Sequence, residues 1–200
     1  MTEYDDKNQS AEDKNEPAFV SMADQFLMAM PSQTSDIFEG GVVYVCEHSE
    51  EGALGLLLNR PTDLSVEQLL ERLELEVNTD LAAQTVFYGG PVQTDRGFVL
   101  HHPAGHYRSS VVLGDMALTT SRDVLEDLAR GEGPQQIFIT LGYAGWSAGQ
   151  LEQEMAANAW LNVSADRNII FNKRPADRYT AALALLGIEP SALSGEAGHA

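Results

Sequence analysis

Four short apolar segments follow one another between residues 85 and 119, with no helical pattern between them. They contain Val, Leu or Phe and are separated by Gly, Pro or Asp, which is typical of strands. A run of successive strands favours an α+β domain over a fold in which a helix follows every strand. We therefore expect a mixed, largely antiparallel sheet. The strand candidates of the whole chain are residues 26–30, 41–46, 54–58, 85–88, 97–101, 110–113, 117–119, 137–141 and 168–171.

About four helices are expected around this sheet. Ser65 precedes apolar residues at helical spacing, and Gln68 stands three positions later, which together form a capping box for the first helix. Ser121 is expected to begin the second helix, and residues 150–160 the third. Pro175 lies just inside the fourth, where its fixed φ suits a first helical turn.

The chain is strongly acidic. Its 200 residues hold 30 Asp and Glu against 12 Lys and Arg, for a net charge of −18. The basic residues are scattered, so a phosphate backbone would be repelled and direct nucleic-acid contact is not expected. High negative charge suits solubility or attraction to a basic protein partner.

Residues 24–190 are expected to form a single domain. Residues 1–23 predict a disordered acidic tail, because they offer little apolar surface for folding, and residues 191–200 predict a flexible one. No segment approaches the roughly 20 apolar residues of a membrane helix, so no membrane contact is expected. The single cysteine, Cys46, excludes an intramolecular disulfide and suits a cytoplasmic protein.

Residues 141–154 are the most distinctive stretch, where an apolar strand is expected to reach an acidic helix through a glycine-rich turn. Glycines allow backbone conformations that other residues avoid, and Tyr143 and Trp146 lie among them. Ser147 and Gln150 match a capping box, which predicts that Ser147 begins the helix. Two aromatic rings on such a loop suit a pocket wall or an anchor for a protein partner.

Cysteine and histidine residues suggest two kinds of chemistry. Cys46 and His48 share one face of a strand, and with His101 and His102 they suggest a metal site. Alternatively, Cys46 could be a nucleophile with His48 or His101 as its base and Asn59 as the orienting residue. A lone Cys-x-His lacks the paired spacing of zinc sites, and a mid-strand cysteine lacks the helix N-terminus that activates a thiol. Ser147 fits Gly-x-Ser-x-Gly, but helix capping explains it without catalysis. We predict no catalytic residue, metal or cofactor.

Several motifs occur in a characteristic order along residues 24–200. They include Asn59-Arg60-Pro61, Gly89-Gly90-Pro91-Val92, Arg96-Gly97-Phe98-Val99-Leu100-His101, Thr120-Ser121-Arg122-Asp123, the glycine-rich stretch and Asn158-Ala159-Trp160. In combination they resemble the YqgE/AlgH family of small bacterial proteins. The resemblance implies a compact α+β fold whose bent sheets form something like an open barrel. It implies no established activity, although the family carries a label as a proposed transcriptional regulator.

Two classes of function are compatible with these features. The first is a cytoplasmic binding or regulatory protein that engages a protein or small ligand without direct DNA contact. The alternative is an enzyme with a His/Asn/Arg-lined cleft that acts on a small molecule; it requires these residues to converge in one cavity. The candidate ligand- or partner-binding residues are Tyr143, Trp146, His48, Asn59, Arg96 and His101.

Overall fold

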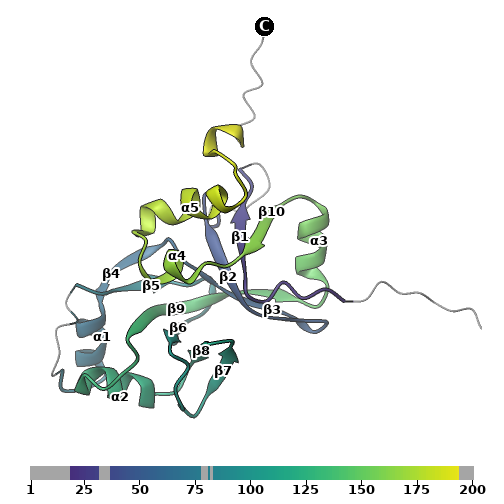
Figure 1. Ribbon diagram of the computed structural model, residues 1–200. Coiled ribbons are helices and arrows are strands. Elements are labelled where there is room, and N and C mark those ends of the chain that lie inside the picture. The colour runs from purple at the N-terminus through teal and green to yellow at the C-terminus, as the bar shows by residue number, and fades with distance from the viewer. Residues whose placement is uncertain (1–18, 32–36, 78–80, 82, 194–200) are drawn as a thin grey trace, which may run out of the picture.

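The computed structural model describes residues 19–31, 37–77, 81 and 83–193, which form a curled sheet with helices packed against it (Figure 1). Residues 1–18 and 194–200, and with them most of the two expected tails, lie outside the described residues. The strands are β1 (Gln25–Ala29), β2 (Val42–Ser49), β3 (Gly52–Leu57), β4 (Pro61–Ser65), β5 (Thr85–Tyr88), β6 (Val92–His102), β7 (Ser110–Leu113), β8 (Met116–Thr119), β9 (Gln136–Ser147) and β10 (Trp160–Ser164). The helices are α1 (Val66–Arg72), α2 (Asp123–Arg130), α3 (Gln150–Ala156), α4 (Arg167–Phe171) and α5 (Arg178–Leu185), with the 3-10 turns η1 (Pro175–Asp177) and η2 (Pro190–Ala192).

The sheet is mixed and largely antiparallel, which confirms the expected fold class. Its main strand order is β10-β1-β2-β3-β9-β6-β8-β7, and β4 pairs with β5 beside this path. The pairing of β5 with β9 is parallel, and the other pairings are antiparallel. The first half of β9 pairs with β5 and β6, and its second half pairs with β3. The two parts of the sheet are therefore joined through one strand.

Alternation of side chains along the strands builds apolar cores on both faces of the sheet. In β1, Phe26 and Met28 enter a core that α4 and α5 cover, whereas Leu27 and Ala29 enter a second core beneath α3. A third core lies under α1 and α2, where Ile139 of β9 packs against apolar residues of both helices. Figure 1 shows these two helices at the lower left, apart from α3 and α5.

The glycine-rich stretch is a strand, not the expected turn. β9 continues to Ser147, and Gly142 within it has a φ of +75°. The connection between β5 and β6 presses against it, so closely that a Cβ on Gly90 would lie 2.2 Å from the carbonyl carbon of Tyr143. Glycine inside a strand often marks such a close backbone approach. These glycines therefore serve the packing of two chain segments.

Local sequence signals predicted some elements correctly and others wrongly. The capping box of Ser65 and Gln68 is confirmed at the start of α1. The expected box at Ser147 is half formed: the Ser147 N–H donates to Gln150 Oε1 at 3.0 Å, but the residue that caps α3 is Gly149. The strand expected at residues 168–171 is helix α4. The Asp166 side chain caps this helix, and a four-residue apolar run does not distinguish a strand from a helix.

No helix in the described part of the chain is long and apolar enough to cross a bilayer.

Candidate functional site

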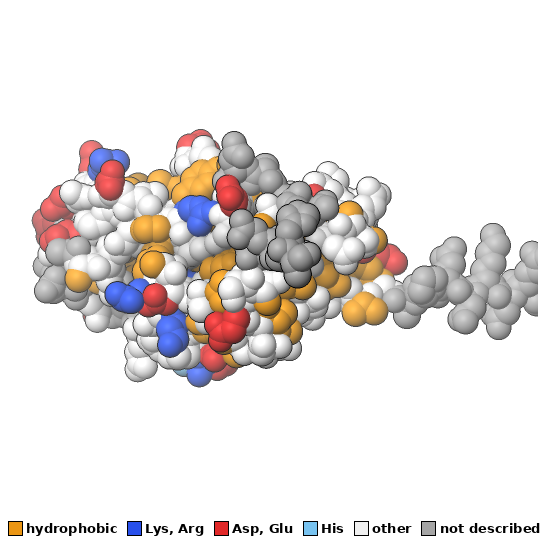
Figure 2. Space-filling view, turned by 90° about the horizontal axis from the view of Figure 1, so that it is seen from above, with side chains coloured by type: hydrophobic (Ala, Val, Ile, Leu, Met, Phe, Trp, Pro, Cys, Tyr) orange, Lys and Arg blue, Asp and Glu red, His pale blue; other side chains and the backbone are white. Residues whose placement is uncertain are grey.

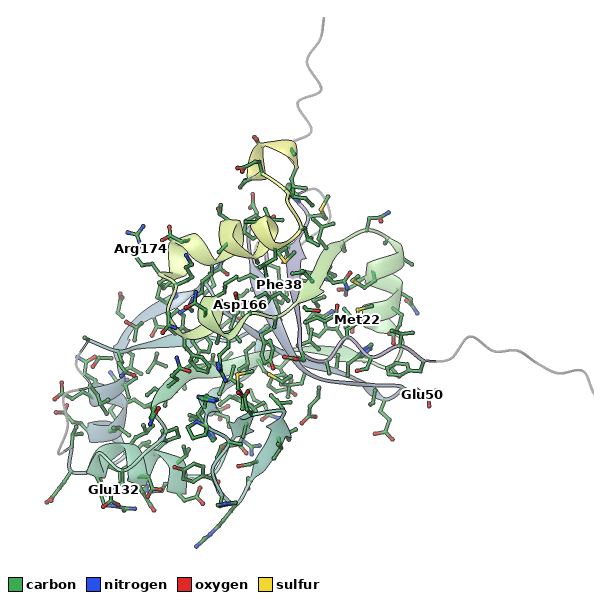
Figure 3. All side chains as sticks on the ribbon, in the orientation of Figure 1. Met22, Phe38, Glu50, Glu132, Asp166 and Arg174 are labelled. Carbon is green, nitrogen blue, oxygen red and sulfur yellow. The ribbon has the colours of Figure 1, made fainter. Side chains whose placement is uncertain are left out.

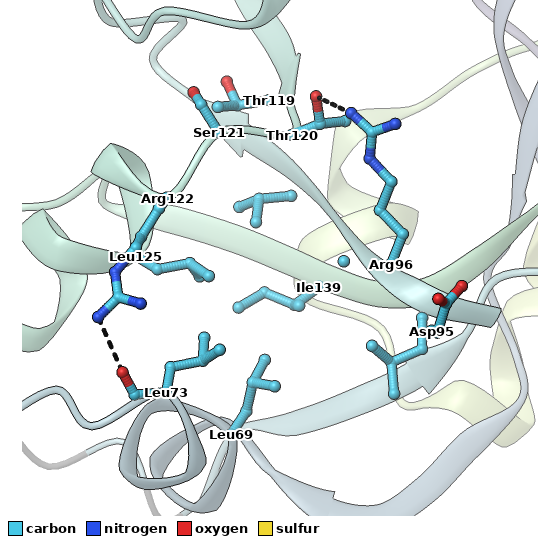
Figure 4. A pocket seen from close by; sticks show the side chains of 13 residues that line it. Leu69, Leu73, Asp95, Arg96, Thr119, Thr120, Ser121, Arg122, Leu125 and Ile139 are labelled. Carbon is cyan, nitrogen blue, oxygen red and sulfur yellow. Dashed lines mark hydrogen bonds between the residues drawn. The ribbon is translucent and has the colours of Figure 1, made fainter. Parts of the chain in front are cut away.

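A hollow of about 210 Å³ lies between α1, α2 and the strands β6, β8 and β9. We call it the arginine-rimmed hollow, because Arg96 and Arg122 stand on opposite sides of its apolar floor (Figure 4). Its lining residues come from four separate segments of the chain: Leu69, Leu73, Asp95, Arg96, Gly97, Val99, Thr119, Thr120, Ser121, Arg122, Leu125, Ile139 and Leu141.

The floor of this hollow is formed by residues of the third core. Val99 and Ile139 are buried, but Leu69, Leu125 and Leu141, which pack against the same core, are only half-buried. The inward faces of the two amphipathic helices α1 and α2 thus converge without closing over the sheet. Leucine surface left facing an open concavity is what an apolar ligand group covers favourably.

The rim of the hollow carries two guanidinium groups with different hydrogen-bond partners. Arg96 Nη2 donates to Thr120 Oγ1 at 3.2 Å. Arg122 Nη2 donates to the backbone carbonyl of Leu73 at 2.8 Å, and its Nε donates to Glu126 at 3.1 Å. Both side chains are exposed, so each guanidinium retains N–H donors that face water. The rim therefore suits a ligand with an acidic head.

His101 lies behind the wall of this hollow and does not line it. It is fully buried, with Nδ1 2.8 Å from the Pro103 carbonyl and Nε2 2.8 Å from Thr119 Oγ1. The carbonyl can only accept a hydrogen bond, so Nδ1–H donates to it and Nε2 accepts a hydrogen bond from the Thr119 hydroxyl. Burial lowers the pKa of His101, which favours this neutral form. His101 is a sealed hydrogen-bonding residue.

Tyr143, Trp146 and His48 lie at a different place, an open hollow of about 570 Å³. We call it the acid-rimmed groove, because Glu47 and Glu51 line it too. It lies between the β2–β3 hairpin, the second half of β9 and the outer strand β7. The structure therefore brings together three of the six candidate residues.

Two of these three side chains are tied into the fold. The Trp146 indole N–H donates to Glu154 Oε2 at 2.8 Å, and Trp160 donates to the same oxygen at the same distance. His48 Nδ1 accepts the Met22 backbone N–H at 2.8 Å, and its Nε2 lies 3.0 Å from Glu152. The polar atoms of Trp146 and His48 are thus already engaged. Of the three, Tyr143 alone has no hydrogen bond within the described residues, and its ring packs against Phe98.

Asn59 and Cys46 have structural positions. The Asn59 side chain accepts the Val42 N–H at 3.1 Å and donates to the Gly40 carbonyl at 2.8 Å, which fixes a loop against β2. Cys46 is 1% exposed, and burial raises the pKa of its thiol, so little thiolate forms. In the described residues no three His, Cys, Asp or Glu side chains are grouped as metal ligands.

The cleft required by the enzyme hypothesis is not assembled. Arg96 lines one hollow, His48 lines another, His101 is sealed, and Asn59 lines neither hollow. Sequence reasoning also missed Arg122, which it treated only as part of a motif. The signal available was its position next to Ser121 at a helix start, and this gives no indication of a neighbour across the sheet.

Comparisons with known proteins agree with this architecture. The AlgH-like family model matches residues 26–191. A UPF0301 protein of Bordetella petrii is 57% identical over 201 residues, covering 100% of both chains, and one of Bordetella avium is 61% identical over 183 residues, covering 91% of this chain and 93% of that one.

Two solved structures share the fold. The solution structure of the AlgH protein of Pseudomonas aeruginosa has 44% identity and a TM-score of 0.75, covering 94% of this chain and 99% of that one. A Corynebacterium diphtheriae crystal structure has a TM-score of 0.66 at 19% identity, covering 90% and 94% of the two chains, and shows the fold alone. The chain described here belongs to the AlgH-like family.

Proposed function

We propose that this protein is a cytoplasmic binding protein with a regulatory role, and that its arginine-rimmed hollow takes a small amphipathic acid. The ligand would place an alkyl or similar apolar body on the leucine floor and one carboxylate or phosphate group against the rim. The single observation that carries this proposal is the position of Arg96 and Arg122 on opposite sides of uncovered leucine surface.

The absence of an ion-pair partner for Arg96 among the described residues supports the proposal. Arg130, Arg167 and Arg174 each pair with a carboxylate. Arg96 instead has the neutral partners Thr120 and Gln93, and in the described part of the chain no carboxylate lies within ion-pair distance of it. In a chain of net charge −18, an arginine without a counter-charge at a concave apolar site favours an anionic ligand group.

The hollow offers few groups for chemistry on such a ligand. The described residues that line it supply hydroxyl groups, one carboxylate and two guanidiniums, but neither histidine nor cysteine. Regulation through direct DNA contact also has little support, since Lys and Arg side chains on the face seen in Figure 2 are dispersed among Asp, Glu and apolar side chains. We therefore propose that regulation acts through a ligand and a protein contact.

Titration calorimetry with octanoate tests this proposal, with octanol and acetate as probes that lack the acidic head or the chain. We expect saturable binding of octanoate, and binding of octanol about tenfold or more weaker, because a hydrogen bond to a charged group contributes about 1.5–3 kcal/mol. A Gly97→Leu variant should abolish binding: Gly97 lines the hollow, and a Cβ built there has no neighbour within 4 Å among the described residues, so a larger side chain should occupy the space of the ligand.

Matched arginine variants separate the rim from general charge effects. Arg96→Gln should weaken octanoate binding by about tenfold, whereas Arg130→Gln, which removes the same charge from the exposed end of α2, should leave it unchanged. Each variant should keep the wild-type circular dichroism spectrum. Equal octanoate affinity in Gly97→Leu and wild type would show that the ligand does not use this hollow.

The acid-rimmed groove supports a second candidate function, the capture of a basic extended protein segment. Val111 and Val112 on β7 are 40% and 66% exposed, and β7 is the last strand of the main sheet path. An exposed sheet edge can accept an added strand, and Glu47 and Glu51 across the groove would attract basic side chains. Tyr143 would then contact the segment.

A synthetic peptide of alternating Lys and Val residues tests this second function. We expect its titration to shift the amide resonances of β7 in NMR spectra, and the Val112→Asp variant to lose the shifts while remaining folded. A peptide that shifts resonances elsewhere, or that binds Val112→Asp equally well, would contradict capture at the groove.

A further inference from the structure

Arg178 is the most deeply buried charged side chain that the functions above do not use. It begins α5 and is 4% exposed. Its Nε donates to the Lys173 carbonyl at 3.1 Å, and its Nη1 donates to the Leu58 carbonyl. The guanidinium lies 4.9 Å from the ring centre of Phe87 and 5.1 Å from that of Phe138. It is therefore held rigidly in one orientation.

The charge of Arg178 has no counter-charge in the described part of the chain. None of the ion pairs there includes Arg178. Burial lowers the pKa of Arg178 to about 10, so the group stays protonated at neutral pH. Carbonyl dipoles and aromatic faces offset part of the lost hydration of a buried cation, but an anion offsets more.

A hollow of about 370 Å³ opens beside this guanidinium. Phe87 and Phe138 lie at its wall with Arg178, and amide residues surround it, among them Gln84, Gln136 and Asn172. Gln84 and Asn172 are exposed and Gln136 is half-buried, so the amides stand between the buried charge and water. Among the described residues, this hollow shares no lining residue with the arginine-rimmed hollow or the acid-rimmed groove.

We infer that this hollow, which we call the Arg178 site, is a second ligand site that binds a small oxyanion through the guanidinium edge of Arg178. The group recognised is a carboxylate or a phosphoryl group. Two observations carry the inference together: a nine-tenths-buried cation without a counter-charge, and a polar-rimmed hollow that adjoins it.

The geometry of the guanidinium fits this ligand. Five N–H donors form a planar fork, and two contacts to backbone carbonyls leave donors on Nη1 and Nη2. Nη2 has no hydrogen-bond partner within the described residues. An oxyanion at the Nη edge accepts two parallel hydrogen bonds, the arrangement for which arginine is suited and lysine is not. Amide N–H groups of the rim would donate to the outer oxygens.

Arg174 provides an internal comparison on the same short segment. It lies four residues earlier, pairs with Asp177 at 2.8 Å and projects away from the body of the protein (Figure 3). An anion that merely screens surface charge would affect Arg174 and Arg178 alike. An anion that enters the hollow would affect Arg178 alone.

NMR titration of the arginine Nε–H resonances tests the Arg178 site in the full chain. Inorganic phosphate and acetate are added separately, with ionic strength held constant by sodium chloride. We expect a saturable shift of the Arg178 resonance with one or both anions and no saturable shift at Arg174. The anion that saturates at lower concentration identifies a phosphoryl or a carboxylate ligand.

Variants confirm where the anion binds. Arg178→Lys should weaken anion binding about tenfold by losing the paired contact, whereas Arg174→Gln should leave the Arg178 shift unchanged. Should Arg178→Lys fail to fold, Gln136→Leu provides the same test from the rim, with an expected severalfold weakening. An Arg178 resonance that never saturates, or one that shifts in step with Arg174, would overturn the proposal.

Discussion

The two ends of β9 show two ways in which one strand is used. Its first half supplies Ile139 and Leu141 to the arginine-rimmed hollow, where leucines stay half-buried and the partners of Arg96 within the described residues are neutral. Its second half supplies Tyr143 and Trp146 to the acid-rimmed groove. There the glycines admit a close neighbouring segment, and the Trp146 indole is bonded inside the fold.

A distinctive sequence therefore does not by itself mark a binding surface. Aromatic residues lie among glycines in the second half of β9, where a close backbone approach accounts for Gly142 and an internal hydrogen bond engages Trp146. The first half is an ordinary apolar strand in sequence. Its interest comes from the side chains that the fold brings over it, Leu69 of α1, Arg96 of β6 and Leu125 of α2. Three substitutions test this contrast.

Gly90→Ala should have the largest effect on stability. Gly90 has a φ of +148°, and an added Cβ would lie 2.2 Å from the Tyr143 carbonyl carbon, which is backbone and has little freedom to shift. We expect a loss of about 4 kcal/mol in the free energy of unfolding, measured by urea denaturation. Gly97→Ala is the control, since open space surrounds it, and its change should stay within about 1 kcal/mol. Similar losses in both variants would mean that β9 does not depend on this close approach.

Glu154→Ala should have the next largest effect. The Glu154 carboxylate accepts a hydrogen bond from the indole N–H of Trp146 and another from that of Trp160. The two tryptophan residues are 7% and 4% exposed. Two buried donors would lose their partner, which predicts a loss of about 2–3 kcal/mol in the free energy of unfolding.

The exposed Glu71 of α1 is the control for this substitution. Glu71→Ala removes the same charge and should change stability by less than about 0.5 kcal/mol. A change of less than about 0.5 kcal/mol in Glu154→Ala as well would mean that the hydrogen bond to Glu154 does not fix the Trp146 ring. The ring would then be available to a partner, and the contrast between the two ends of β9 would disappear.

His101→Gln should have the smallest effect, seen in the pH dependence of stability. The pKa of His101 is lowered by burial, so below the pKa of the unfolded chain, about 6.5, the unfolded state takes up a proton that the folded state does not. Wild-type stability should therefore fall as the pH decreases from about 7 to 5, and the fall should be shallower in His101→Gln. Urea denaturation across this range measures it. Parallel pH curves for the two proteins would show that His101 is not sealed behind the hollow.

Much of the fold followed from the sequence where one local signal dominated. Apolar runs bounded by turn residues located β2, β5 and β6, and the capping box at Ser65 located α1. β10 was missed because its short, partly polar sequence gives no periodic signal; it forms by pairing with β1, more than 130 residues away, as in Gln25 opposite Ser164. The apolar residues 168–171 became a helix because Asp166 caps them and α5 packs beside them.

The candidate sites were harder to predict than the fold. Arg96 was named from the sequence, but Arg122 and the leucines that complete its hollow are brought to it only by the crossing of α1 and α2 over the sheet. The buried, uncompensated state of Arg178 also depends on Phe87 and Phe138, which belong to strands far from it in sequence. Such sites are properties of tertiary contacts, for which no local pattern exists.

In the proposed function, the hydrogen bond from Arg122 to the Leu73 carbonyl would link occupancy of the hollow to the end of a helix. This carbonyl belongs to the residue that closes α1, so under the proposal one guanidinium would serve as both latch and receptor. An acid that draws Arg122 toward itself competes with that latch. If binding of the acid weakens a contact elsewhere that stabilises the end of α1, then by thermodynamic linkage that contact weakens binding of the acid by the same factor.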